Sequence, residues 1–68
     1  MPSSDKHITI RELETLKLAA KGMTQKQIAE EMQVKEVTVK KHLSSVYAKL
    51  GVANKISAIH MARAQKLI

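Results

Sequence analysis

The first half of the chain places apolar residues at helical spacing in two stretches, each bounded by residues typical of helix ends. A first helix is predicted over about 10–21, because Gly22 directly after it can adopt the left-handed conformation that ends a helix. A second is predicted over about 25–32, where Thr24 and Gln27 have the spacing of an N-terminal capping box. The two helices would be joined by a very short connection.

The second half of the chain continues the same pattern. After a turn at 33–35, a third helix is predicted over about 36–50, ending at Gly51. Its apolar residues follow one narrow stripe, formed by Val39, Leu43, Val46 and Leu50. A fourth helix, over about 55–66, would begin after the capping residue Asn54. With no strand pattern, the prediction is an all-α fold, a compact four-helix bundle containing a helix-turn-helix.

Size and composition exclude several classes of protein. Sixty-eight residues make a single small domain, which we place at 9–68, with 1–8 as a linker or disordered N-terminus. The chain has no cysteine and its three histidines lack metal-ligand spacing, so we expect no metal and no cofactor. We expect no enzyme, since no nucleophile–base pair, glycine-rich phosphate loop or paired carboxylates are present. No apolar run spans a membrane and no signal peptide is present, which favours a cytoplasmic location.

Net charge is distributed very unevenly along the chain. Residues 1–34 hold five basic and five acidic side chains, whereas residues 35–68 hold seven basic side chains and one acidic one, Glu36. The whole excess of +6 therefore begins where the predicted third helix begins. A one-sided basic field of this kind favours a polyanionic partner. A merely soluble basic surface explains the same composition, and both interpretations stay open on charge alone.

The outward face of the predicted third helix suits the major groove of DNA. At about 100° per residue, the side opposite the apolar stripe carries Val37, Lys41, Ser44 and Ala48. Lys41 can donate to guanine, and the hydroxyl of Ser44 suits either type of base. For either residue, solvent exposure on the polar face of an amphipathic helix is the alternative.

Candidate contacts with the phosphate backbone flank this face. Thr24, Gln25 and Lys26 begin the second helix, where free amides and the helix dipole favour an anion. On the third helix, the bordering residues are Lys40, Tyr47 and Lys49. Tyr47 packing over the edge of the bundle is an equal alternative. Glu12 would lie at the margin of the core, where it needs a cationic partner, and Lys49 and Lys55 are the candidates.

Three segments carry a resemblance to a known family. These are 9–16, 22–29 and the run from Thr38 to Val52, continued by Asn54 and Lys55. Together they resemble the LuxR/FixJ/NarL-type helix-turn-helix domain, and the match covers residues 8–68. The resemblance implies a four-helix domain whose third helix recognises the major groove and whose fourth helix forms a dimer. It implies base recognition by Lys40, Lys41 and Ser44, and backbone contacts by Thr24, Gln25, Lys26, Thr38 and Lys49.

Two departures from the family pattern affect the expectations. Lys35 stands where the family usually has a serine or threonine to cap the third helix, and loss of such a cap costs about 1 kcal/mol. Ile56 replaces a usual polar residue and lies on one strip with His60 and Arg63, away from the inward alanines of the fourth helix. This strip is the predicted dimer interface, and an isolated exposed isoleucine is an equal alternative.

The predicted function is sequence-specific binding of double-stranded DNA by a bacterial transcription regulator that dimerises through its fourth helix. The natural context would be the C-terminal output domain of a response regulator or quorum-type receptor, or a free-standing regulator. RNA polymerase is a further candidate partner, whereas no membrane and no small molecule is expected to bind. Two alternatives are a sigma-factor-like promoter-recognition domain and a basic module that binds protein or membrane without DNA specificity.

Overall fold

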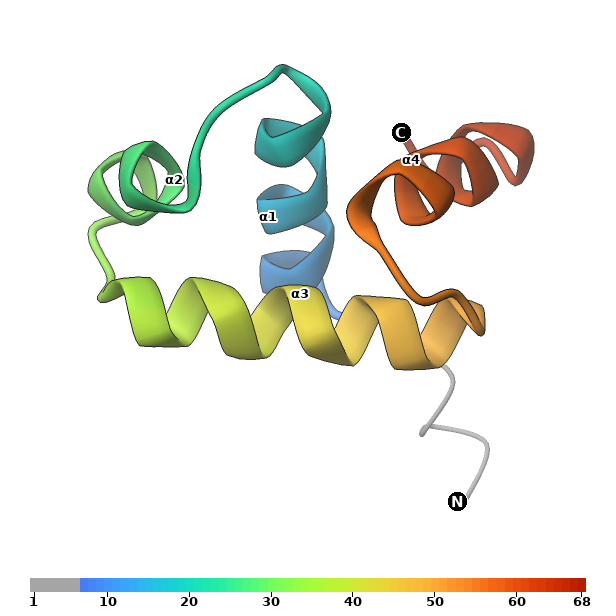
Figure 1. Ribbon diagram of the computed structural model, residues 1–68, viewed down its shortest axis with the longest axis horizontal. Helices are drawn as coiled ribbons and strands as arrows, with labels where there is room; N and C mark the ends of the chain where they lie inside the picture. The colour runs from blue at the N-terminus through green and yellow to red at the C-terminus, as the bar shows by residue number, and fades with distance from the viewer. Residues whose placement is uncertain (1–6) are drawn as a thin grey trace.

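In the computed structural model, residues 7–68 are described, and they form four α-helices and no strand (Figure 1). The helices are α1 (Ile10–Ala20), α2 (Gln25–Met32), α3 (Glu36–Leu50) and α4 (Lys55–Ala64). α3 contacts all the others, and α1 crosses it between α2 and α4, which do not touch each other. The predicted all-α helix-turn-helix bundle is confirmed. Of the predicted linker, residues 1–6 lie outside the described residues.

Side chains cap three of the four helices at their first turn. Thr9 at the start of α1 and Thr24 at the start of α2 each complete a capping box with the residue three positions on. Asn54 accepts from the Ser57 amide at 2.9 Å and caps α4. Lys35, at the start of α3, makes no side-chain cap. The caps expected at Thr24 and Asn54, and the missing cap at Lys35, are therefore confirmed.

Every helix is followed by a residue in the left-handed conformation. Two of these residues are the glycines Gly22 and Gly51, and the others are Gln33 (φ 59°) and Lys66 (φ 60°). The turn at Lys66 lets the Leu67 amide donate to the Ala62 carbonyl at 2.8 Å, which ends α4. Helix four is therefore two residues shorter than predicted. Its end is hard to recognise in the sequence, because the left-handed residue there is a lysine and not the usual glycine.

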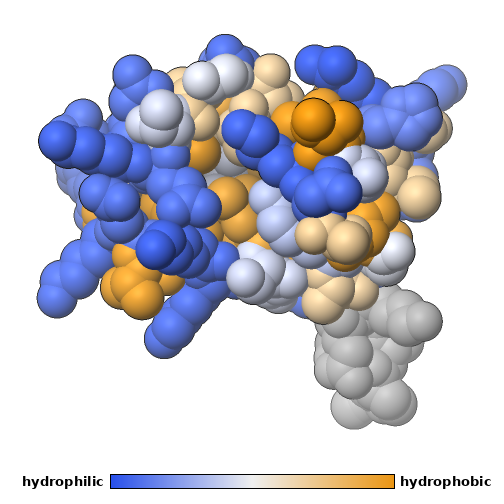
Figure 2. Space-filling model, in the orientation of Figure 1, coloured by the Kyte–Doolittle hydropathy of each residue, from blue (hydrophilic) through white to orange (hydrophobic). Residues whose placement is uncertain are grey.

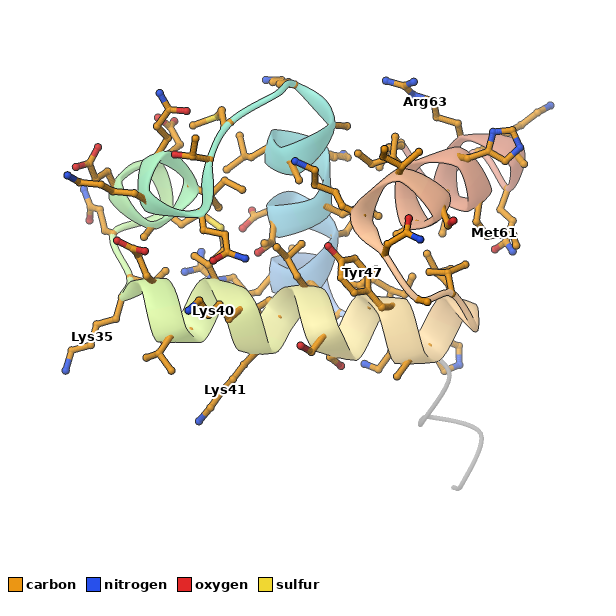
Figure 3. The ribbon with its side chains drawn as sticks, in the orientation of Figure 1. Lys35, Lys40, Lys41, Tyr47, Met61 and Arg63 are labelled. Atoms are coloured by element: carbon orange, nitrogen blue, oxygen red, sulfur yellow. The ribbon has the colours of Figure 1, made fainter. Side chains whose placement is uncertain are left out.

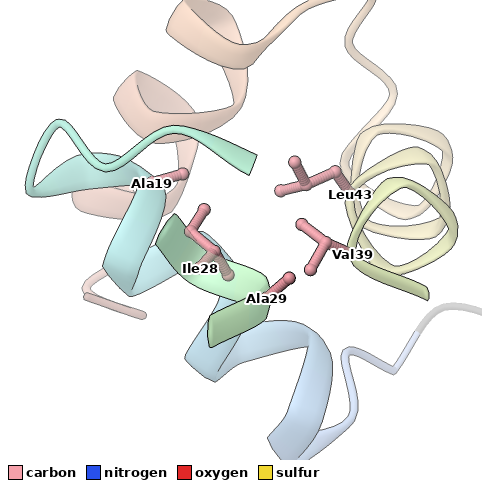
Figure 4. Close-up of a cluster of buried hydrophobic side chains, with 5 residues drawn as sticks. All are labelled: Ala19, Ile28, Ala29, Val39 and Leu43. Carbon is pink, nitrogen blue, oxygen red and sulfur yellow. The ribbon is translucent and has the colours of Figure 1, made fainter. Parts of the chain in front are cut away.

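Two hydrophobic clusters form the core, one on each side of α1. The first joins α1, α2 and the N-terminal half of α3 (Figure 4), and consists of Ala19, Ile28, Ala29, Val39 and Leu43. The second joins α1, α4 and the C-terminal half of α3, and consists of Leu16, Val46, Ala58 and Ala62. The half-buried ring of Tyr47 packs against both clusters. The predicted apolar stripe of α3 thus supplies both halves of the core, with Leu50 half-buried at its end.

The uncapped start of α3 predicts a stabilising substitution. Lys35 has the extended backbone of an N-cap residue (φ −81°, ψ 155°), so Lys35→Ser can place its hydroxyl near the Thr38 amide without moving the chain. We expect the free energy of unfolding, measured by urea denaturation, to rise by about 1 kcal/mol. Lys35→Ala is the matched control, since it removes the same charge without adding a cap. Equal stabilisation by both variants would assign the effect to charge.

Candidate nucleic-acid interface

The core fixes the rotation of α3 and so decides which of its side chains face outward. Val39 and Val46 are fully buried and Leu43 nearly so. The residues between them on the other side of the helix are exposed, and these are Val37, Lys41, Ser44 and Ala48. In Figure 3 the Lys41 side chain points directly away from the bundle. The predicted outward strip is therefore present on the surface of α3.

Basic side chains gather around the N-terminal half of this strip. Lys35 extends outward from the start of α3, and Lys40 lies on the flank beside Lys41 (Figure 3). All three are exposed. Hydrophilic side chains also dominate the surface over α2 and this half of α3 in Figure 2. The face has the convex shape and positive charge that fit a groove of DNA.

The start of α2 is exposed to solvent. Thr24, Gln25 and Lys26 are all exposed. The Thr24 hydroxyl is occupied, because it accepts from the Gln27 amide at 3.1 Å. Among the hydrogen bonds of residues 7–68, the amides of Gln25 and Lys26 donate to no protein acceptor. These two amides, with the Lys26 ammonium, can hold a phosphate at the positive end of the helix.

Thr38 and Tyr47 occupy the two flanks of α3 and are half-buried. The Tyr47 ring packs against both clusters, as in the alternative considered from the sequence, in which it packs over the edge of the bundle. Burial raises the pKa of the Tyr47 phenol, which keeps the hydroxyl protonated and able to donate a hydrogen bond.

Lys49 forms an ion pair that links α3 to the start of α1. Its Nζ donates to Glu12 Oε1 at 2.7 Å, and its side chain is only 16 % exposed. Of the two partners considered from the sequence, Lys49 and Lys55, the structure selects Lys49. The same carboxylate oxygen accepts from the Thr9 amide at 3.0 Å, so Glu12 also belongs to the α1 cap. The pair directs the Lys49 ammonium toward α1, where a DNA phosphate would have to compete with Glu12.

The environment of Glu12 strongly favours its charged form. Burial by itself raises the pKa of this carboxyl, but Lys49, Ser45 and the Thr9 amide stabilise the carboxylate and lower the pKa from 4.5 to about 2. Sequence reasoning missed Ser45. Its position four residues before Lys49, and hence on the same side of α3, is the signal that could have found it.

The strip predicted as a dimer interface is exposed on α4. Ile56 is 78 % exposed, and His60 and Arg63 are exposed as well. Ala58 and Ala62, on the other side of the helix, are fully buried. The strip of Ile56, His60 and Arg63 lies on α4 and shares no residue with the outward strip of α3.

Two other features are absent from residues 7–68. No group of three or more histidine and acidic side chains there could hold a metal ion. None of the described helices is both long enough and apolar enough to cross a membrane.

A helix-turn-helix with an exposed, basic second helix defines a DNA-binding domain, and comparison with known proteins assigns it. Residues 6–62 match the model of bacterial regulatory proteins of the luxR family. The chain therefore belongs to the LuxR family of helix-turn-helix transcription regulators.

Two relatives show how this domain is used elsewhere. The chain is 41 % identical over 61 residues to the HTH-type transcriptional regulator AlkS of Alcanivorax borkumensis, covering 90 % of this chain and 7 % of that protein. It superposes with a TM-score of 0.88 and 42 % identity on a crystal structure of the response regulator ChrA of a heme-sensing two-component system. That match covers 91 % of this chain and 31 % of the other. The chain thus corresponds to a small part of each relative.

The Glu12–Lys49 pair predicts a specific dependence of stability on pH. Because the pKa of Glu12 is depressed in the folded state, its contribution is fully present above pH 4.5 and is lost as pH falls toward 2. The shift corresponds to about 3 kcal/mol. We expect the difference in unfolding free energy between wild type and Glu12→Gln to shrink by about this amount across that window.

Urea denaturation of both proteins between pH 5 and about 2.5 measures this difference. The comparison isolates the contribution of Glu12, because both proteins carry all the other acidic side chains. Glu14→Gln is the control. Glu14 pairs with Arg11 at 3.3 Å, but both side chains are about half exposed, so its effect should stay within about 0.5 kcal/mol. A wild-type–Glu12→Gln difference that does not change with pH would contradict the assignment.

Proposed function

We propose that the domain binds double-stranded DNA in a sequence-specific manner by placing α3 in the major groove. The observation that carries this proposal is the position of Lys41 and Ser44, exposed on the side of α3 opposite its buried stripe. The first helix of the motif, α2, packs against α3 and holds its own N-terminus free for the phosphate backbone. Membership of the LuxR family supports this mode of binding.

The residues proposed to contact DNA divide into two groups, those that contact base edges and those that contact the backbone. Lys40, Lys41 and Ser44 contact base edges, where lysine donates to guanine O6 and N7 and serine can donate or accept. Contacts with the backbone come from Thr24, Gln25, Lys26, Thr38 and the Tyr47 hydroxyl. Lys49 belongs to this group only if a phosphate displaces Glu12 from the Lys49 ammonium or shares this ammonium with Glu12. The ion pair makes Lys49 the weakest member of the set.

Dimerisation through α4 would match the protein to a paired DNA site. The exposed strip of Ile56, His60 and Arg63 combines an apolar side chain near the start of α4 with two polar side chains further along it. Two copies on adjacent half-sites gain affinity because the second contact becomes intramolecular. Dimers that bind DNA in this way impose the spacing of their half-sites.

The relatives support a proposal for the biological context. We propose that the chain is the output domain of a response regulator in a two-component system or of a quorum-type receptor, with RNA polymerase as a further partner. ChrA is described as a response regulator and supports the first of these settings. The proposed role is one of binding, without a catalytic step or a small-molecule ligand in this domain.

Selection from a library of random DNA duplexes at two salt concentrations tests the proposal directly. A preferred sequence, with affinity falling steeply as salt rises, is expected of a protein that neutralises several phosphates. Equal binding to all duplexes would favour a basic module without specificity, and absence of binding at low salt would overturn the proposal.

Lys41→Ala should relax base preference at one position in each half-site. The Lys41 side chain points away from the bundle (Figure 3), so in the proposed complex it reaches the groove floor and donates to a base edge. The discrimination lost should be of the order of 1–3 kcal/mol. Repeating the selection with the variant measures it. Weaker binding with unchanged base preference would move Lys41 to the backbone group.

Ile56→Asp should weaken binding to a paired site far more than binding to a single half-site. A charge at this position would be buried by a second copy, at a cost of several kcal/mol. Titration of both duplexes by fluorescence anisotropy measures the ratio. Ile10→Asp is the matched control, because Ile10 is equally exposed, at 76 %, but lies on α1. Equal losses on both duplexes would remove α4 as the dimer interface.

A further inference from the structure

Val37 is an exposed apolar side chain in the most polar region of the molecule. It is the second residue of α3 and is 54 % exposed. Lys35, Glu36, Lys40 and Lys41 surround it in the sequence, and all four are exposed. Figure 2 shows a hydrophobic patch enclosed by hydrophilic side chains below the N-terminal half of α3. The fold gives no evident reason for an apolar residue here.

Neither packing nor helix formation accounts for Val37. It belongs to neither hydrophobic cluster, whereas Val39 two residues later is fully buried. A β-branched side chain also lowers helix propensity relative to alanine, lysine or glutamate. The isopropyl group therefore remains solvated in the free domain, and its stabilising contact would have to come from a partner.

The geometry places Val37 in line with the proposed base contacts. It lies one turn before Lys41 and two turns before Ser44, on the same outward strip of α3. Four residues of helix advance by about 6 Å, which is close to two base-pair steps of about 3.4 Å along a DNA strand. When Lys41 contacts a base edge, Val37 faces the floor of the same groove a few ångströms away.

The side chain of valine selects the group that it can contact. It neither donates nor accepts a hydrogen bond, so phosphates and the polar edges of bases offer it nothing. The C5-methyl group of thymine is the apolar group that base pairs present in the major groove. A contact between the two removes apolar surface of both from water.

We propose that Val37 is a specificity-determining residue that recognises the C5-methyl group of a thymine about two base pairs from the base contacted by Lys41. This inference rests on the proposed function, because it requires α3 to lie in the major groove. It adds an apolar contact to the polar ones made by Lys40, Lys41 and Ser44.

Replacement of single thymines by deoxyuridine tests the proposal, since it removes the methyl group and leaves every hydrogen-bonding group in place. Starting from the selected duplex, each thymine is replaced in turn, and affinity is measured for wild type and for Val37→Ala. Wild type should lose about four-fold in affinity at one thymine in each half-site. Val37→Ala should bind the thymine duplex and the duplex with deoxyuridine at that position with nearly equal affinity. At every other thymine, replacement by deoxyuridine should change the affinity of the wild type and of Val37→Ala by the same factor.

Ile10→Ala is the matched control, as it truncates an apolar side chain of greater exposure on α1. It should retain the full four-fold effect of the methyl group. If Val37→Ala retains the methyl effect, or loses affinity equally for both duplexes, the inference is overturned while the proposed function stands. If no duplex is preferred by wild type, the proposed function fails and the inference fails with it.

Discussion

The packing of α3 against α1 and α2 is the constraint on which the rest of this domain depends. A helix rotated by one residue turns by about 100°, so its outward face is determined by which residues the core holds inward. Val39 and Leu43 belong to the cluster on one side of α1, and Val46 belongs to the cluster on the other side. Because this stripe is buried, Lys41 and Ser44 on the opposite side of α3 face the solvent. The interface is therefore a consequence of the core.

The Glu12–Lys49 pair adds a second constraint of a different kind. Hydrophobic packing is tolerant of small rotations, whereas a contact of 2.7 Å between charged atoms is not. The pair joins the first turn of α1 to the last turns of α3, and Thr9 connects the same carboxylate to the α1 cap. In a small domain with a modest core, such a contact fixes the orientation of α1 relative to α3. The same contact gives Lys49 a structural role.

Most of the element boundaries could be predicted, because local signals mark them. Thr24 and Gln27 form the capping box that their spacing indicates, and α2 and α3 have the predicted limits. The end of α4 differs from the prediction for a physical reason. Lys66 adopts a left-handed conformation that glycine normally signals, and Leu67 after it both packs against the second cluster and donates to the Ala62 carbonyl. Gln33 plays the same part after α2, within a turn that the sequence did indicate.

Helical periodicity and charge were enough to identify the outward strip of α3 and the basic half of the chain, since both depend only on the order of residues. Long-range partners were not accessible in this way. The choice of Lys49 over Lys55 for Glu12 and the packing of Tyr47 against both clusters depend on how α1 crosses α3. A crossing of two helices is set by the shapes of all side chains between them, and no local pattern encodes it.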